Sequence, residues 1–164
     1  MSDFYTSLCA QARALTDGEP DLVANLSNIS ALLNLCLPDL NWVGFYLRRT
    51  PQTLVLGPFQ GKPACLRIPM GQGVCGTAAA SGQVQRVADV HAFEGHIACD
   101  AASNAEIVLP IFAGGQVVAV LDIDSPSLNR FSAEDEAGLA ELVKLLENLD
   151  WSQASCSQLG APSL

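Results

Sequence analysis

Cysteines are the residues whose types and spacing most directly suggest chemistry in this chain. Cys65, Cys75 and Cys99 fall on segments expected to be loops or turns, with separations of ten and twenty-four residues. Redox catalysis by thiols requires one thiolate that attacks and a second thiol that can reach it to form a disulfide. The three positions permit such a meeting, but three buried structural thiols would give the same pattern.

The other three cysteines suggest no chemistry. Cys9 and Cys36 lie inside apolar helical patterns, where a free cysteine packs as a small hydrophobic residue. Cys156 lies in a polar segment, and we expect residues 151–164 to form a flexible C-terminal tail. We expect a cytoplasmic protein without structural disulfides, because no apolar run is long enough to span a membrane and the first residues lack the pattern of a secretory signal.

A group of acidic residues is the second candidate site. Asp122 and Asp124 lie two residues apart near the end of a strongly apolar predicted strand, so they share one face of it. Glu106 opens the partner strand of the same predicted hairpin and could approach them. Like charges beside a hydrophobic strand cost stability unless something uses or neutralises them, and such carboxylates are enriched at functional sites. Trp42 and Tyr46, on one face of another predicted strand, could form an apolar wall with polar tips, although core packing explains them equally well.

The charge distribution limits the possible partners. Eight Lys and Arg stand against seventeen Asp and Glu, which gives a net charge of −9 that would repel nucleic acid and anionic membranes. Between Arg86 and Arg130 there is no Lys or Arg, but there are six acidic side chains. A pocket built from this stretch would suit an ammonium group, although a solvated acidic face is the ordinary explanation for most of these carboxylates.

Two further motifs are weaker. The sequence from Gly71 to Gly76 matches G-x-G-x-x-G, but that fingerprint requires a parallel βαβ unit and its neighbours here look like antiparallel hairpins. His96 with the three loop cysteines could be drawn as a zinc site, yet no two cysteines have the spacing of the common structural sites. We therefore expect neither a metal nor a cofactor.

The periodicity of apolar residues predicts one α+β domain over residues 1–150. Expected elements are helices at 4–15 and from 19 to 36, a hairpin of strands 41–49 and 53–59, a short helix at 73–81, a strand at 84–87, a second hairpin of strands 105–112 and 117–124, and a helix that begins at Ser132. Their order predicts an antiparallel sheet with helices on one side. The long segment between Asp89 and Asn104 shows no periodicity and is long enough to suspect a function.

Several of these motifs together resemble the free methionine-(R)-sulfoxide reductases, which are GAF-like single-domain enzymes. The resemblance runs from about Asp21 to Asn148, and the segments that carry it are residues 41–47, 57–61, 64–65, 68–69, 73–76, 96–99, 106–108 and 120–125. It implies a six-stranded antiparallel sheet with helices packed on its faces, a homodimer, free methionine (R)-S-oxide as substrate and thioredoxin as reductant.

The resemblance also implies roles for individual residues. Cys99 matches the nucleophile, Cys65 the thiol that closes the disulfide, and Cys75 an auxiliary thiol near the substrate. Of the acids, Glu106 or Asp124 would supply the proton that sulfoxide reduction needs, and these two with Asp122 would bind the amino group, while Trp42 and Tyr46 would enclose the S-methyl end. Two other functions remain open: a GAF-type small-molecule sensor without turnover, and a thiol enzyme that reduces peroxide.

Overall fold

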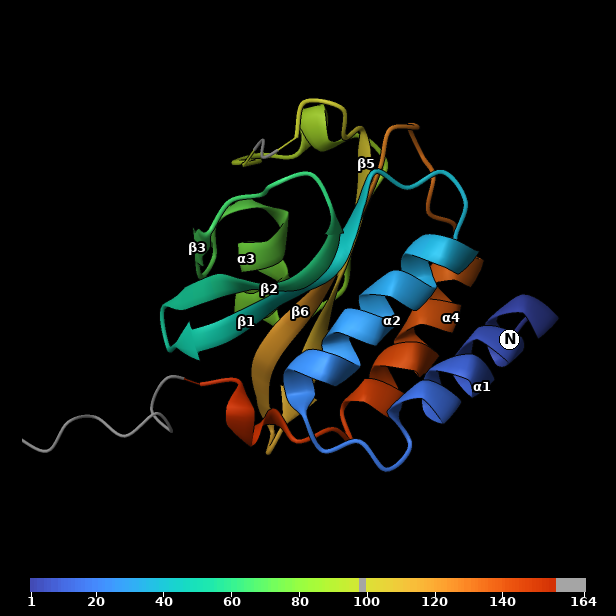
Figure 1. Cartoon of the computed structure of the whole chain (residues 1–164). Helices are drawn as coiled ribbons and strands as arrows, with labels where there is room; N and C mark the ends of the chain where they lie inside the picture. The colour runs from blue at the N-terminus through green and yellow to red at the C-terminus, as the bar shows by residue number, and fades with distance from the viewer. Residues whose placement is uncertain (98–99, 156–164) are drawn as a thin grey trace, which may run out of the picture.

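The computed structural model describes residues 1–97 and 100–155 of the chain. Six strands form one antiparallel sheet in the order β3-β2-β1-β6-β5-β4 (Figure 1). The strands are β1 Trp42–Thr50, β2 Thr53–Gly61, β3 Arg67–Pro69, β4 Gln85–Val87, β5 Ala105–Ala113 and β6 Gln116–Ser125. The α-helices are α1 Asp3–Thr16, α2 Leu22–Cys36, α3 Gly73–Ser81 and α4 Ala133–Leu146, and short 3₁₀ helices cover Val90–Ala92 and Trp151–Gln153. The predicted α+β class and six-stranded sheet are confirmed.

Helices cover both faces of this sheet. Helices α1, α2 and α4 pack together on one face, and α3 packs against β3, β4, β5 and β6 on the other (Figure 1). The alternation along β1 follows this division, because Val43 faces the three-helix core while Trp42 and Tyr46 face the α3 side. The expectation of helices on one side only is therefore wrong, whereas the arrangement implied by the family resemblance is confirmed.

Helix α3 lies on the sheet face where the sequence pattern predicts no helix. Its small residues let it pack close to the neighbouring backbone. Its buried residues are almost all small, including Ala78 and Ala79. A Cβ atom at Gly76 would lie 2.5 Å from the carbonyl oxygen of Pro69, so only glycine allows the helix to come this near. Gly82 ends the helix in the left-handed conformation, with φ of 67°. Small apolar residues carry no directional pattern, which is why sequence periodicity does not indicate the face that α3 covers.

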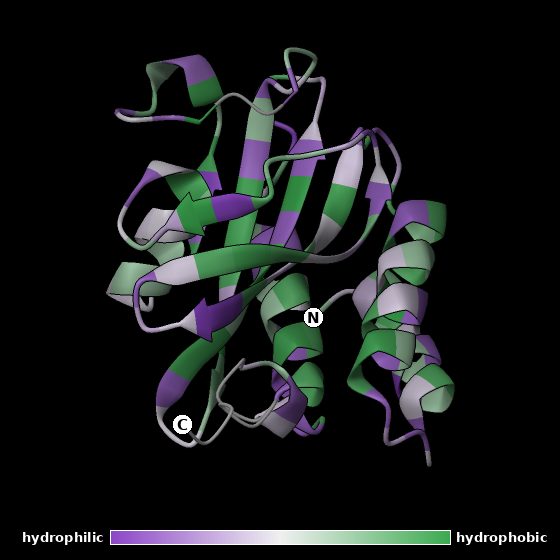
Figure 2. Cartoon of the chain, turned by 60° about the vertical axis from the view of Figure 1, so that its left-hand side comes forward, coloured by the Kyte–Doolittle hydropathy of each residue, from purple (hydrophilic) through white to green (hydrophobic). Residues whose placement is uncertain are grey.

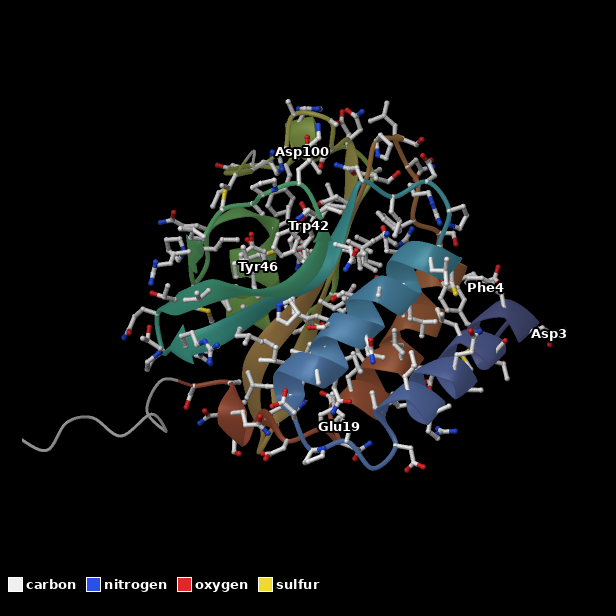
Figure 3. The ribbon with its side chains drawn as sticks, in the orientation of Figure 1. Asp3, Phe4, Glu19, Trp42, Tyr46 and Asp100 are labelled. Carbon is white, nitrogen blue, oxygen red and sulfur yellow. The ribbon has the colours of Figure 1, made fainter. Side chains whose placement is uncertain are left out.

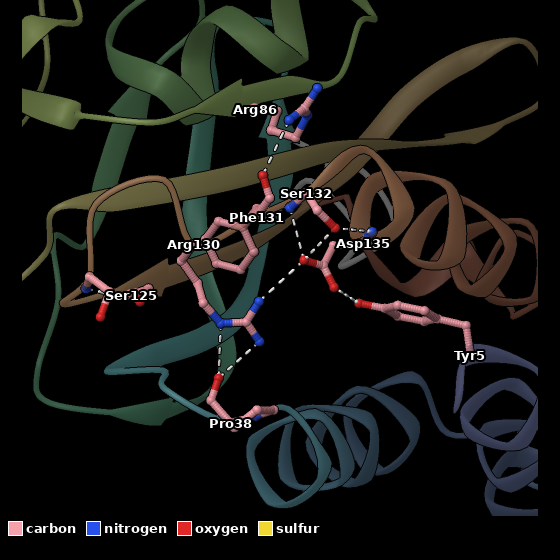
Figure 4. Close-up of polar contacts among 9 residues, drawn as sticks. Tyr5, Pro38, Arg86, Ser125, Arg130, Phe131, Ser132 and Asp135 are labelled. Carbon is pink, nitrogen blue, oxygen red and sulfur yellow. Dashed lines mark hydrogen bonds and ion pairs between the residues drawn. The ribbon is translucent and has the colours of Figure 1, made fainter. Parts of the chain in front are cut away.

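A polar network ties the helices of the other face together (Figure 4). Ser132 and Asp135 form the predicted capping box at the start of α4. Asp135 also accepts a 2.6 Å hydrogen bond from the Tyr5 hydroxyl of α1 and pairs with Arg130 at 3.2 Å. The Arg130 guanidinium in turn donates to the carbonyl oxygen of Pro38, which follows α2. The Asp135 carboxylate thus links α4 directly to α1 and, through Arg130, to the end of α2.

The packed part of the chain continues beyond the expected boundary at residue 150. The Trp151 side chain is buried in the three-helix core and donates a 2.8 Å hydrogen bond to the carbonyl oxygen of Leu146. Ala154 is also buried there, and Cys156 lies outside the described residues. The described part of the chain contains no helix long and apolar enough to cross a membrane.

Candidate active site

Strand register brings the three predicted acids together on the α3 side of the sheet. Glu106 of β5 pairs with Asp124 of β6, and Asp122 is two residues along β6 on the same face. On the other side of β6, Trp42 of β1 pairs with Asp124. Figure 2 shows hydrophilic bands of this kind across the central strands of a largely hydrophobic sheet. The prediction that Asp122 and Asp124 share a face and that Glu106 approaches them is confirmed.

These acids line a pocket that encloses about 540 Å³, part of it open to solvent. Its lining comprises Trp42, Tyr46, Pro63, Ala64, Ile68, Gln72, Gly73, Val74, Cys75, His96, Ile97, Asp100, Ser103, Glu106, Asp122 and Asp124. In Figure 3, Asp100, Trp42 and Tyr46 follow one another along the same side of the sheet. Neither Lys nor Arg is among the described residues of the lining, and His96 is the one basic side chain among them.

Burial and mutual repulsion set the protonation of the acids. The pKa of Glu106 lies well above its ordinary value, because the carboxyl is buried and because negative charges on Asp122 and Asp124 disfavour a third negative charge on Glu106. Burial and the Asp122 charge likewise raise the pKa of Asp124 well above its ordinary value. Burial also raises the pKa of Asp122, but hydrogen bonds from Glu106 and Cys75 oppose that rise. Asp122 is therefore the carboxyl best placed to carry the negative charge, and Glu106 the one best placed to hold a proton.

One oxygen of the Asp122 carboxylate has no hydrogen-bond partner among the described residues. This atom is Oδ1, and Asp122 is only 5% exposed. A buried, unpaired carboxylate oxygen is costly, so such an atom in a pocket wall is an acceptor for a bound donor. An ammonium group of a ligand would provide this oxygen with both a positive charge and an N–H donor.

Cys75 lies against the acids at the start of α3. The thiol is free and buried, and its sulfur lies within 4.8 Å of carboxylate oxygens of both Glu106 and Asp122. Burial and the neighbouring carboxylates raise the pKa of this thiol well above its ordinary value. A metal would need all three groups deprotonated, which this environment opposes. The arrangement therefore favours a neutral thiol and a proton-bearing acid cluster.

Cys65 occupies a different position, on a segment held against the sheet. It is disulfide-bonded, whereas Cys9, Cys36 and Cys75 are free. The Tyr46 hydroxyl donates a 2.8 Å hydrogen bond to the carbonyl oxygen of Cys65. Cys99, the predicted nucleophile, lies outside the described residues.

The two predicted aromatic residues do more than the sequence suggested. Both line the pocket, and their rings stack with centroids 5.9 Å apart. The Trp42 indole also donates a 3.2 Å hydrogen bond to the carbonyl oxygen of Lys62, so both side chains use their polar tips to hold the segment that carries Cys65. The predicted apolar wall with polar tips is thus present, and its tips fix the position of a cysteine.

Sequence reasoning missed a polar clamp at the other end of the pocket. The Asn41 amide donates to Asp100 Oδ2 at 3.0 Å and to Ser103 Oγ at 2.9 Å, and both partners line the pocket. The long 89–104 segment is thereby fixed against the start of β1. His96 of the same segment also lines the pocket, and burial lowers the pKa of its imidazole. The only available signals were the aperiodic segment itself and the position of Asn41 beside an aromatic motif.

The sheet face covered by α3 thus contains a buried cluster of carboxyl and thiol groups, and the chain also matches a known domain family. The chain matches the family model described as GAF domain over residues 29–148. It therefore belongs to the GAF domain family. The fold and the site together define a GAF domain whose pocket contains a thiol and three acid groups.

Relatives narrow the family further. The chain is 58% identical over 148 residues to the "Free methionine-R-sulfoxide reductase" of Escherichia coli (strain K12), covering 90% of this chain and 89% of that protein. It superposes with a TM-score of 0.82 and 53% identity on "fRMsr of Staphylococcus aureus (complex with substrate)", covering 87% of this chain and 93% of that one. A "Putative GAF sensor protein from Burkholderia vietnamiensis" is similar too, with a TM-score of 0.87, 52% identity and coverage of 93% and 96%. The chain belongs to the free methionine-R-sulfoxide reductase family and is an oxidoreductase.

Proposed function

We propose that this protein reduces free methionine (R)-sulfoxide to methionine. The observation that carries the proposal is the buried group of Glu106, Asp122 and Asp124 beside a thiol, in a pocket whose described lining contains no Lys or Arg. Such a site offers what sulfoxide reduction needs, namely a proton held at neutral pH and a carboxylate for the substrate ammonium. The names of the relatives support the same substrate.

The chemical steps require two thiols and one acid. We assign the attack on the sulfoxide sulfur to the Cys99 thiolate, while the sulfoxide oxygen takes a proton from Glu106 or Asp124. The oxygen passes from the methionine sulfur to the Cys99 sulfur, so that methionine leaves as the thioether and Cys99 becomes a sulfenic acid. The Cys65 thiol then condenses with this sulfenic acid, so that a disulfide forms and water leaves. Thioredoxin supplies the two electrons that return both cysteines to thiols.

The protonation of Cys75 supports this choice of nucleophile. A thiol acts as a nucleophile in its thiolate form, and the acids around Cys75 raise the pKa of its thiol far above its ordinary value. Cys75 is suited instead to donate a hydrogen bond to Asp122 and so to share in the proton network. It remains the auxiliary thiol of the proposal.

The same pocket accounts for a preference for the free amino acid. The ammonium of free methionine sulfoxide would bind Asp122, whose buried Oδ1 has no hydrogen-bond partner among the described residues, whereas a peptide-bound residue has no ammonium to offer. Trp42 and Tyr46 would enclose the S-methyl group beside a fixed proton donor. A fixed wall and a fixed donor accept one configuration of the chiral sulfur, which we assign as R.

We further propose that the protein works as a homodimer, as the family resemblance implies. Light scattering of the purified chain would measure its mass in solution. A mass near twice 17.2 kDa supports the dimer, and a mass near 17.2 kDa removes it from the proposal.

A substrate comparison separates this function from its rivals. The purified protein is given thioredoxin, its reductase and NADPH, and NADPH oxidation is followed with free methionine (R)-sulfoxide or with hydrogen peroxide. Turnover on the sulfoxide that far exceeds turnover on peroxide supports the proposal. Binding without turnover would identify a sensor, and faster turnover on peroxide would identify a peroxide-reducing enzyme. Cys36→Ser, a change at a free cysteine packed against the three-helix core, serves as a control that should keep full activity.

A further inference from the structure

Part of the segment around Cys65 presents its side chains to solvent while its backbone is held against the sheet, and Cys65 itself is half-buried against the core on the α3 side. The carbonyl oxygens of Lys62, Cys65 and Leu66 accept hydrogen bonds from Trp42 Nε1, the Tyr46 hydroxyl and the Leu56 N–H, respectively. With these carbonyls fixed against the sheet, Leu66 is 64% exposed, and Lys62 and Arg67 are exposed on either side of the cysteine. A large apolar side chain is thus displayed beside a redox-active position.

This surface also differs in charge from the rest of the molecule. The chain carries a net charge of −9 and has no Lys or Arg between Arg86 and Arg130. Lys62 and Arg67 lie within five positions of each other, and neither is in an ion pair among the residues that the structure describes. We call Lys62, Leu66 and Arg67 the redox patch. It is an apolar point between two cations on an acidic protein.

Cys65 is half-buried beside this patch and lies outside the described wall of the substrate pocket. Pro63 and Ala64 line the pocket, but Cys65, Leu66 and the two cations are not among the described residues of its wall. A protein that approaches from outside would therefore meet Cys65 beside the redox patch while the pocket remains free for substrate. A surface that combines an exposed hydrophobic anchor with a charged margin has the composition of a transient protein interface.

We propose that the redox patch is the docking surface for the reductant, a thioredoxin-type dithiol protein whose surface around its own cysteines is apolar and bordered by carboxylates. This inference rests on the proposed function. The reductant's thiolate attacks the Cys65 sulfur, the bond from Cys65 to Cys99 breaks, and Cys99 leaves as a thiolate ready for the next substrate. The reductant's second thiol then attacks the mixed disulfide, which releases Cys65 and leaves the reductant oxidised by two electrons.

Kinetics with the reductant as the varied component test the surface. Leu66→Ser should raise the KM for thioredoxin roughly 10-fold, the effect of losing one buried leucine from an interface. The double change Lys62→Glu with Arg67→Glu should raise it several-fold at low salt, and the difference should shrink as salt screens the charges. Leu128→Ser, at a leucine that is 60% exposed elsewhere, and Arg13→Glu, at an exposed arginine of α1, are matched controls that should leave the KM unchanged.

Two readouts without thioredoxin keep this test separate from the proposed function. All variants should release methionine from the prereduced enzyme in a single turnover like the wild type, and should turn over normally with dithiothreitol. If the wild-type enzyme releases no methionine in a single turnover, the proposed function fails. If the wild type turns over but the patch variants keep the wild-type KM for thioredoxin, the docking surface is wrong.

Trapping of the mixed disulfide tests the point of attack. A thioredoxin variant that lacks its second cysteine is mixed with the oxidised enzyme, and the cross-linked peptides are identified by mass spectrometry. The inference requires the adduct on Cys65, with a yield that falls in Leu66→Ser. An adduct on Cys99 or Cys156 would overturn it.

Discussion

Replacement of Glu106 by glutamine tests the acid at the centre of the site. The change keeps the size of the side chain but removes the proton that burial and two neighbouring carboxylates hold on it. General acid catalysis contributes roughly 10² to 10⁴ to a rate, which corresponds to about 2.7 to 5.4 kcal/mol of transition-state stabilisation. We therefore expect kcat/KM for free methionine (R)-sulfoxide to fall by ~10² to 10⁴.

The fold should tolerate this change. A neutral amide replaces a carboxyl that is already held neutral, and the side chain can no longer ionise beside Asp122 and Asp124, so the melting temperature at neutral pH should be unchanged or higher. Activity is measured in the coupled assay with thioredoxin, and the melting temperature by circular dichroism. Glu141→Gln, at an exposed glutamate paired with Lys144, is the matched control and should keep both values. A Glu106→Gln enzyme within a few-fold of wild type, with an unaltered melting temperature, would remove Glu106 from the mechanism.

Three further predictions follow from the site. In a single turnover without thioredoxin, Cys65→Ser should still release about one methionine per chain and Cys99→Ser none; a full burst from Cys99→Ser would transfer the attack to Cys75. Among free (R)-, free (S)- and N-acetylated methionine sulfoxide, only the first should turn over well, because the acetylated compound loses a charge-assisted hydrogen bond worth roughly 1.5 to 3 kcal/mol; comparable rates on it would refute the ammonium site at Asp122. The raised pKa values of the acids also make stability depend on pH, since their contribution is fully present below the unfolded-state pKa of about 4 and is lost as pH rises through the folded-state pKa; urea titrations from pH 4 to pH 8 should show wild type losing more free energy of unfolding than Glu106→Gln, and parallel curves would count against the buried cluster.

Local patterns were sufficient for much of the fold. The alternation along β1 separates Val43 from Trp42 and Tyr46, and the structure places them in two different cores. The Ser132 capping box begins α4 as expected. The second helix begins at Leu22 rather than at residue 19, because Asp21 is its N-cap. The correct predictions for β1 and for the start of α4 both concern residues that are close in sequence, where periodicity and capping act directly.

The part of the site that lies on the β5–β6 hairpin could be predicted from the sequence. Asp122 and Glu106 belong to adjacent strands joined by a short turn, so their approach follows from register. Contacts across long separations could not be read in this way. Asn41 precedes β1 and contacts Asp100 and Ser103 across about sixty positions of sequence, and no pattern within either segment indicates the other.

Release of methionine from the prereduced protein is the most direct test of the proposed function. The protein is reduced, freed of reductant and mixed with free methionine (R)-sulfoxide, and the methionine formed is counted against the number of chains. We predict about one methionine per chain without thioredoxin, together with loss of two free thiols, and continuous release once thioredoxin and its reductase are added. No methionine above the level of a Cys99→Ser control, or release without any loss of thiols, would contradict a thiol-dependent reduction at this site.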